Sequence, residues 1–274
     1  MIFISKKWLK IILLVFIALI CTTIYSYSAK EKSIVANAPK KAYVALVIDD
    51  AGSHGDGVDE LLKLNIPITA AVMPFLEYSQ KDAQDCFDAG IEVILHIPME
   101  SETGLASWLG PKPIKCSMSD EEIRATVLEG LEEVKWAKGM NNHMGSKAIK
   151  DKRVMQQILK VAKENGLFFL DSKTISSNIA KEVSSKMNVA YLSRDVFLDN
   201  SKKEKEIEDA MIKLEKIALQ KGYAIGIGHV GGQGGKVTIN TINKMAEELK
   251  KNGIEFVYLS ELDSILNGYE KAKE

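Results

Sequence analysis

Short apolar runs rich in valine, isoleucine and phenylalanine recur from residue 41 onward, and longer amphipathic segments separate them. Apolar runs that alternate with amphipathic helices in this way are typical of parallel sheets built from βα units. The pattern predicts eight strands, over residues 42–49, 68–74, 92–98, 140–145, 167–171, 189–195, 223–229 and 255–260.

The helices between these strands carry recognisable start and stop signals. Ser119 followed three positions later by Glu122 predicts a capping box, and Asp151 can cap the next helix. The last two predicted helices, over residues 203–221 and 239–252, each end at a glycine. Helices that end in glycine before a strand are what βα units require.

The strand candidates are continuously apolar, which indicates strands that are buried on both faces. This favours a barrel over an open sheet. No internal repeat or composition shift divides the region. We therefore expect an α/β fold, a distorted or incomplete (β/α) barrel of about seven to eight strands, in one domain over residues 42–268.

The N-terminus has the order of an export signal. Three lysines within the first ten residues precede an uncharged, mostly apolar run over residues 11–25. A basic segment followed by an apolar one predicts a signal peptide or a single membrane anchor over residues 1–28. A polar linker, residues 29–41, follows it. The basic side stays in the cytoplasm, so the domain is expected to be exported.

Composition narrows the function. The 274 residues are 46% hydrophobic and 27% charged, which is typical of a globular protein and excludes a disordered chain or a fibre. Lys and Arg (36) balance Asp and Glu (37), so no basic surface favours nucleic acid as a partner. Three cysteines match no zinc ribbon or redox motif.

Polar side chains follow four of the predicted strands. Three of the four histidines, His96, His143 and His229, lie at strand ends, and Asp49 and Asp50 lie at a fourth. A single histidine there is more often structural. In barrel and doubly wound folds, however, the carboxyl ends of the strands meet at one mouth. Together these residues predict a shared metal or catalytic site.

The residue types indicate the chemistry of such a site. Adjacent carboxylates on a strand point to opposite sides, so Asp49 and Asp50 are expected to divide metal binding and proton transfer. Two imidazoles and one carboxylate make a typical catalytic zinc site, and the same set suits iron. His54, in a glycine-rich loop, is expected to be a loop residue or a peripheral contact.

The strings VALVIDDAG, ITAAVMP, EVILHIPME, NNHMGS, FFLDSKT, YLSRDVFLD and IGIGHV occur in this order. Over residues 42–266 the chain thereby resembles the divergent polysaccharide deacetylase family, a branch of the carbohydrate esterases with a NodB-like barrel. The resemblance implies a deacetylase that acts on an acetylated glycan with a divalent metal, most simply Zn²⁺. It also implies that Asp49 is the general base, that Asp50 binds the metal and that His229 is the general acid.

The sequence departs from the family pattern after the third strand. Ordinary members carry two metal-binding histidines four residues apart, whereas here Glu100 follows His96 at that spacing. His143 is the natural replacement for the second imidazole. Glu100 and Asp171 are then expected to support the metal ligands or to serve as alternative ligands.

Three further residues are candidates for substrate binding. Arg194 and Asp195 are expected to orient the base or bind substrate, or else to form a structural ion pair. Trp108, in a segment over residues 101–117, is expected to overhang the mouth and stack on a sugar ring, or to be buried in a surface flap.

The leading hypothesis is thus an exported, metal-dependent deacetylase of an N- or O-acetylated glycan, with Asp50, His96 and His143 as zinc ligands. The alternative is a non-catalytic envelope protein that binds a glycan or a protein on the same scaffold. A third interpretation is a metal hydrolase of non-sugar substrates, such as an amidohydrolase. Resemblance of fold alone does not decide among them.

Overall fold

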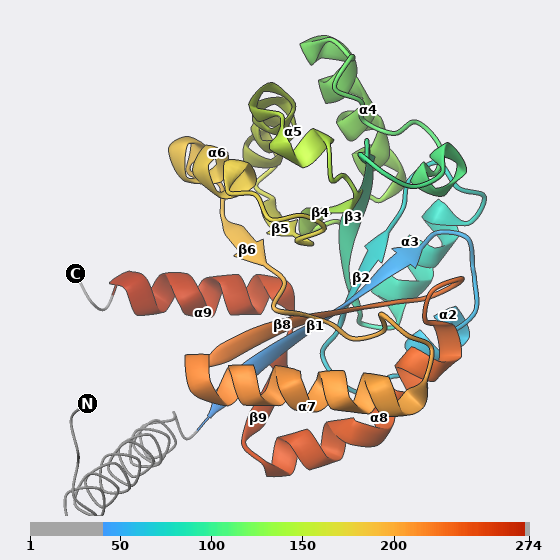
Figure 1. Cartoon of the computed structure of the whole chain (residues 1–274), viewed down its shortest axis with the longest axis vertical. Coiled ribbons are helices and arrows are strands. Elements are labelled where there is room, and N and C mark those ends of the chain that lie inside the picture. The colour runs from blue at the N-terminus through green and yellow to red at the C-terminus, as the bar shows by residue number, and fades with distance from the viewer. Residues whose placement is uncertain (1–40, 272–274) are drawn as a thin grey trace, which may run out of the picture. The chain divides into compact units, whose positions relative to one another are not determined.

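The strands of this protein form one curled parallel sheet with helices packed around it (Figure 1). The structure, a computed structural model, describes residues 41–271. The predicted signal peptide or anchor and nearly all of the predicted linker lie outside the described residues. Between residues 41 and 271, no helix is both long and apolar enough to cross a membrane.

Eight strands follow one another across the sheet, and a ninth pairs beside them. In spatial order these are β6 (Tyr191–Ser193), β5 (Phe168–Asp171), β4 (Gly139–Met144), β3 (Glu92–Met99), β2 (Thr69–Val72), β1 (Ala42–Ala51), β8 (Tyr223–His229) and β7 (Val196–Phe197). β9 (Ile254–Val257) pairs with the first half of β1, and β2 pairs with its second half.

The expected incomplete barrel is confirmed. β6 and β7 lie at the two ends of the strand order, yet only Arg194 and Asp195 separate them in the chain. The strand predicted over 189–195 is β6, which is shorter than predicted, and β7 was not predicted. The Arg194 amide donates to the carbonyl of Asp171 on β5, and the next amide donates to Ile225 on β8. The backbone changes partner between adjacent residues, which an apolar pattern does not reveal.

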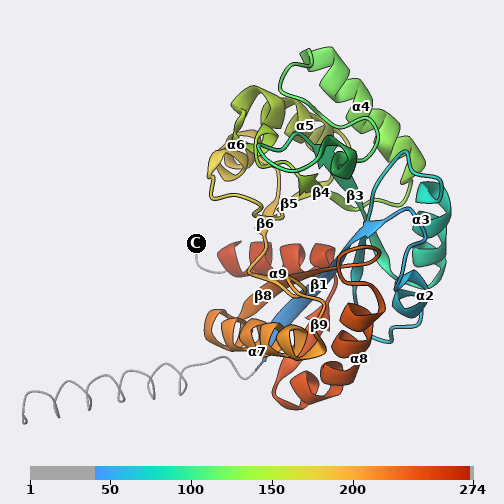
Figure 2. The same ribbon diagram turned by 45° about the vertical axis from the view of Figure 1, so that its right-hand side comes forward.

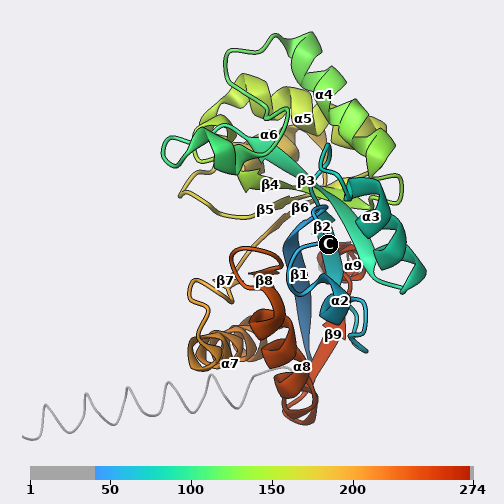
Figure 3. The same cartoon turned by 90° about the vertical axis from the view of Figure 1, so that its right-hand side faces the viewer.

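Helices other than α9 cover the outer side of the sheet. α3 packs against β2 and β3, as Figure 3 shows from the side. The helices are α2 (Val58–Leu61), α3 (Ser79–Asp88), α4 (Asp120–Glu133), α5 (Lys152–Glu164), α6 (Ile179–Met187), α7 (Glu204–Lys221), α8 (Gly235–Lys251) and α9 (Leu259–Lys271), with short 3-10 helices at Ala106–Leu109 and Ala148–Lys150.

The predicted helix caps are confirmed. Ser119 and Glu122 form both hydrogen bonds of the capping box of α4, and Asp151 accepts from two amides at the start of α5. α8 begins at Gly235, four residues before its predicted start, because Asp56 accepts a hydrogen bond from the Lys236 amide. Asp56 lies 180 positions earlier in the sequence, so the glycines at the start of α8 carry no local signal for a helix and are typical of a loop.

The core has two apolar layers because side chains alternate along each strand. On β1, Leu46 and Ile48 face the helices, whereas Ala45 and Val47 face the inside of the curl. Helix α9, which was not predicted, lies along this inner side (Figure 2). It starts immediately after β9, and Leu262 on α9 packs into the inner cluster, at the end of the sheet where the strands begin.

Replacing Leu262 with alanine is expected to lower the free energy of unfolding by about 2–5 kcal/mol, because the cavity left at a fully buried leucine is not refilled. Urea denaturation of the parent and the variant measures this. Ile265→Ala, on the same helix but only partly buried, is the control and should cost less. Equal losses would contradict the role assigned to Leu262.

Candidate metal site

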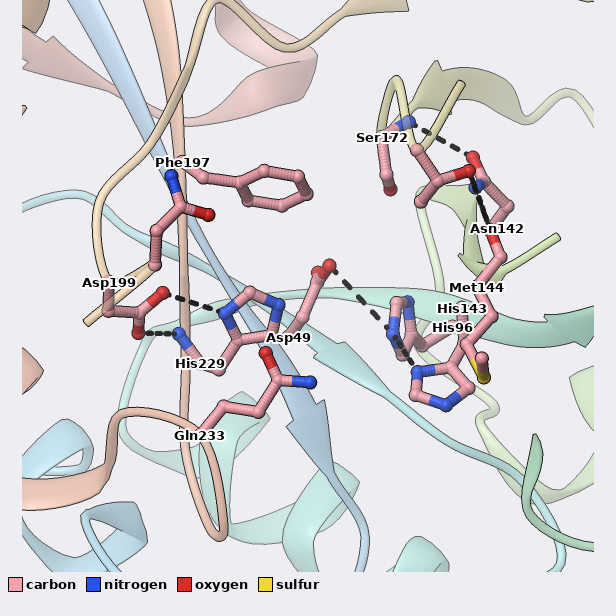
Figure 4. Close-up of a pocket in the computed structure, with 12 residues that line it drawn as sticks. Asp49, His96, Asn142, His143, Met144, Ser172, Phe197, Asp199, His229 and Gln233 are labelled. Carbon is pink, nitrogen blue, oxygen red and sulfur yellow. Dashed lines mark hydrogen bonds and ion pairs between the residues drawn. The ribbon is translucent and has the colours of Figure 1, made fainter. Parts of the chain in front are cut away.

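The carboxyl ends of β1, β3, β4 and β8 surround a cavity of about 150 Å³ (Figure 4). Its position is the one that the fold dictates, since loops and strand ends on this face converge. The cavity is lined by Asp49, His96, Asn142, His143, Met144, Ser172, Thr174, Phe197, Asp199, Asn200, His229 and Gln233.

The strand register brings the polar residues together. Asp49 pairs with His229 across β1 and β8, and His143 on β4 pairs with Pro98, two residues beyond His96 on β3. Asp50 lies at an irregularity of the β1–β2 ladder and has a positive φ of 70°. Such a conformation costs about 1–2 kcal/mol in a residue other than glycine, and it is most common at functional sites.

This irregularity corrects the expectation that Asp49 and Asp50 point to opposite sides. Nε2 of His96 lies 3.2 Å from Asp50 Oδ1 and 3.8 Å from Asp49 Oδ2. Both carboxylates therefore approach the same imidazole, Asp50 more closely. The alternation of a regular strand is lost where the backbone turns.

Three potential ligand atoms form a tight triangle, which we call the tripod. Asp50 Oδ1 lies 3.2 Å from His96 Nε2 and 3.0 Å from His143 Nδ1. The two imidazole nitrogens are 3.1 Å apart. The three side chains come from three different strand ends, which is the arrangement predicted from the sequence.

Hydrogen bonds on the far side of each ring fix which nitrogens face the tripod. Nε2 of His143 donates to the Trp108 carbonyl at 2.9 Å, so its Nδ1 presents a lone pair. Nδ1 of His96 donates to Asn141 Oδ1 at 2.7 Å, so its Nε2 presents a lone pair as well. Such outer partners are typical of metal-binding histidines.

These residues fit a divalent cation. Asp50 Oδ1 is buried and makes no hydrogen bond among the described residues, although two lone pairs face it. Two nitrogens and one charged oxygen, with coordination positions left for water, suit zinc.

His229 is held by a buried carboxylate that the sequence analysis did not identify. Nδ1 of His229 donates to Asp199 Oδ1 at 2.8 Å, and its amide donates to Asp199 Oδ2 at 2.7 Å. Burial lowers the pKa of His229, but the hydrogen bond and charge of Asp199 outweigh burial and raise it to about 9. At neutral pH the ring is therefore an imidazolium.

Asp49 lies between this imidazolium and the two imidazoles of the tripod (Figure 4). Its side chain is buried, and Oδ1 accepts from Asn141 Nδ2 at 2.9 Å. Burial raises the pKa of Asp49 above its ordinary value, although the charges of His96 and His229 oppose this. A carboxylate with a raised pKa beside a cation site can accept a proton.

Glu100 and Asp171 do not support the tripod, which corrects the prediction for both. Glu100 accepts from Lys147 Nζ at 2.7 Å and from the Cys116 amide at 2.8 Å. Asp171 accepts from the Tyr191 hydroxyl at 2.8 Å. Glu100 therefore anchors the segment over 101–117, and Asp171 anchors the β5–β6 edge. Spacing from His96 did not reveal these other partners.

Arg194 and Asp195 connect strands and do not pair with each other. Arg194 donates to the carbonyls of Ser172 and Lys173, and its guanidinium lies 3.6 Å from the centre of the Phe197 ring. Asp195 accepts from the Ile225 amide and from Lys221. Neither lines the cavity, but Arg194 supports Phe197, which does.

Two further predicted residues lie at the edge of the site. The Trp108 side chain is not buried, because the residue is 61% exposed, and its carbonyl contacts His143. His54 pairs with Asp82 at 2.8 Å and does not line the cavity, so it is a peripheral loop residue, as expected.

Sequence reasoning missed Asn141, Ser172 and Asp199. Asn141 stands two residues before His143 in a motif that had already been singled out, so the paired asparagines were an available signal. Asp199 is the last residue of the highlighted string YLSRDVFLD, but nothing local connects it with His229, which it reaches only through the pairing of β7 with β8.

Comparison with protein families and with known proteins finds relatives of this chain. Residues 46–262 match the family model for divergent polysaccharide deacetylases. An Escherichia coli K12 protein, the uncharacterized protein YibQ, is 31% identical over 186 residues, which are 68% of this chain and 58% of that protein. The match thus spans less than two thirds of that relative.

Solved structures share the fold. An uncharacterized protein from Agrobacterium tumefaciens C58 has a TM-score of 0.71 at 22% identity, over 82% of this chain and 90% of that one. A peptidoglycan N-acetylglucosamine deacetylase has a TM-score of 0.51 at 16% identity, over 81% of this chain and 88% of that one. At these identities the likeness concerns the fold alone.

Proposed function

We propose, because the chain belongs to the divergent polysaccharide deacetylase family, that it is an exported, zinc-dependent hydrolase that removes acetyl groups from a glycan. The observation that carries the proposal is the tripod of Asp50, His96 and His143, with interatomic distances of 3.0–3.2 Å, beside Asp49 and His229 in one cavity. These groups are the ones that metal-assisted hydrolysis requires.

The roles follow from the geometry. Zinc held by the tripod would polarise the acetyl carbonyl and make water more acidic. Asp49 accepts the proton of the attacking water, for which its buried carboxylate lies next to the tripod. His229 donates a proton to the departing amine or alkoxide, and Asp199 keeps it protonated for this purpose.

The size of the cavity favours a small acyl group. At about 150 Å³ it is smaller than the roughly 300–1,000 Å³ typical of drug-sized ligands. Met144 and Phe197 supply apolar walls for a methyl group. The sugar would then lie outside the cavity, where the exposed indole of Trp108 is available for stacking. An acetylated amino-sugar oligomer fits this arrangement, with its acetyl group in the cavity and its sugar rings outside.

Acetate release tests the proposal. Full-length protein loaded with zinc is expected to release acetate from N- or O-acetylated oligosaccharides, to stop when a chelator removes the metal and to recover when zinc is restored. His229→Gln is expected to bind zinc like the parent but to release acetate about 100-fold or more slowly, because the general acid is gone.

The contrary result is equally specific. A parent protein that binds one zinc but releases acetate from none of a broad panel of acetylated glycans is not a deacetylase. Glycan binding without hydrolysis would then favour the non-catalytic envelope protein. Hydrolysis of non-sugar amides alone would favour another metal hydrolase on the same scaffold.

A further inference from the structure

Asn141 contacts both halves of the site with one buried amide. Its side-chain oxygen accepts from His96 Nδ1 at 2.7 Å, and its nitrogen donates to Asp49 Oδ1 at 2.9 Å. A weaker contact of 3.2 Å joins the same nitrogen to Ser172 Oγ. Asn141 faces His96 across the β3–β4 ladder and is fully buried, so water does not replace these partners.

The partners dictate which way the amide points. A carboxylate oxygen only accepts hydrogen bonds, so the amide nitrogen of Asn141 must face Asp49. The amide oxygen must then face His96, and only a protonated Nδ1 can donate to it. The ring proton is therefore on the side away from the tripod, and Nε2 is free to bind a cation.

The two imidazoles of the tripod are thus fixed by different means. His143 donates to the backbone carbonyl of Trp108, which no side-chain substitution removes. His96 depends on the Asn141 side chain. Of the two rings, His96 is the one whose tautomer a single substitution can release.

We propose that Asn141 is a positioning residue with two separable effects: its oxygen sets the His96 tautomer that binds the cation, and its nitrogen holds Asp49 in place as the base. The inference rests on the metal-binding part of the proposed function. It makes zinc affinity depend on a residue that is not a ligand. The two effects can be separated because different atoms of the amide produce them.

Two substitutions at this position distinguish the effects. Asn141→Leu removes both hydrogen bonds at similar volume, and we expect zinc affinity to fall about 10- to 100-fold. Asn141→Asp keeps an oxygen for His96 Nδ1 but offers Asp49 a second carboxyl in place of a donor. Zinc affinity should then stay at the parent level or tighten, while acetate release falls.

The experiment measures zinc affinity by chelator competition on the full-length parent and variants, with thermal unfolding as a check that each protein folds. Nitrogen NMR of the histidine rings in the zinc-free proteins, at a pH high enough for the rings to be neutral, is the second readout. His96 should be protonated at Nδ1 in the parent and in Asn141→Asp, and should show a mixture of tautomers in Asn141→Leu. Ser172→Ala, which removes only the 3.2 Å contact, is the matched control and should bind zinc like the parent.

Three results would overturn the inference. Asn141→Leu could bind zinc as tightly as the parent, Asn141→Asp could lose as much affinity as Asn141→Leu, or Ser172→Ala could lose a similar amount. Either of the last two results would indicate that the substitution loosens the packing of the cavity. The donor and acceptor arrangement of Asn141 would then not be what sets zinc affinity. Because zinc affinity needs no turnover, a failure of every protein to release acetate would count against the proposed reaction only.

Discussion

Replacing His143 with alanine is expected to weaken zinc binding by more than about a hundredfold, because loss of an outer partner of a ligand already costs about 10- to 100-fold and here a ligand itself is lost. Acetate release should fall about a thousandfold, since a bound metal contributes several kcal/mol to such a reaction. Elemental analysis and chelator competition measure the first effect, and an acetate assay measures the second.

The matched control for this prediction is the histidine outside the cavity. His54 pairs with Asp82 and takes no part in the tripod, so His54→Ala should bind zinc like the parent. A second group of possible ligands, His54, Asp82 and Asp85, makes this control necessary. If His143→Ala holds its zinc as tightly as the parent, the ligand assignment is wrong. If His54→Ala also loses zinc, the metal binds elsewhere.

The position of the site could be predicted because it follows from general rules of the fold. Apolar strands that end in aspartate or histidine bring those residues to one face whatever the exact strand order. Asp49, His96, His143 and His229 needed only this rule, and the structure brings them around one cavity. The helix caps at Ser119 and Asp151 were predictable for a similar reason, because both signals are local.

What escaped prediction depends on partners that are distant in the sequence. Asn141 and Asp49 are 92 positions apart, and Asp199 and His229 are 30 apart, so the residue types were visible but their pairing was not. For Glu100 the error is the opposite one, because a role at the metal site was predicted that the structure does not support. Its spacing from His96 suggested a metal-related role, whereas Lys147, 47 positions later, pairs with its carboxylate.

The same limit explains the break between β6 and β7. The strand predicted over residues 189–195 ends early, at Ser193, because the Arg194 amide still donates to Asp171 on β5 whereas the Asp195 amide donates to Ile225 on β8. The hydrophobic pattern indicates which residues are buried and which type of secondary structure they form, but it does not indicate which strand they pair with. The partner switch also matters for the site, because it brings Phe197 and Asp199 beside His229.

Replacing Asp199 with asparagine is expected to move the alkaline limit of acetate release to lower pH. His229 donates a proton only when it is protonated, so activity is retained below its pKa and lost as the pH rises through it. In the parent that loss is expected near pH 9. In the variant, burial still lowers the pKa and only the charges of Asp49 and Asp50 still raise it, so the pKa should fall toward its ordinary value of 6.5.

The size of this effect follows from the two values. At pH 8 a group with a pKa near 9 is mostly protonated, whereas one with a pKa of 6.5 is mostly neutral, so Asp199→Asn should release acetate about 30-fold more slowly at that pH. Near pH 6 the difference should become much smaller. Rates across pH 5 to 10, with zinc content checked at each pH, measure both limits.

Thr238→Val separates the charge of Asp199 from the packing around it. Thr238 donates to the same carboxylate at 2.9 Å, so the substitution disturbs the buried network but leaves the negative charge beside His229. The alkaline limit of Thr238→Val should stay near that of the parent.

The free energy of unfolding should also fall as the pH rises. A histidine whose pKa is raised by folding stabilises the fold at pH values below its unfolded pKa, and that contribution is lost as the pH rises toward 9. The parent should therefore lose stability between about pH 6.5 and 9, and Asp199→Asn should not. An unchanged alkaline limit in Asp199→Asn would mean that His229 is not the acid.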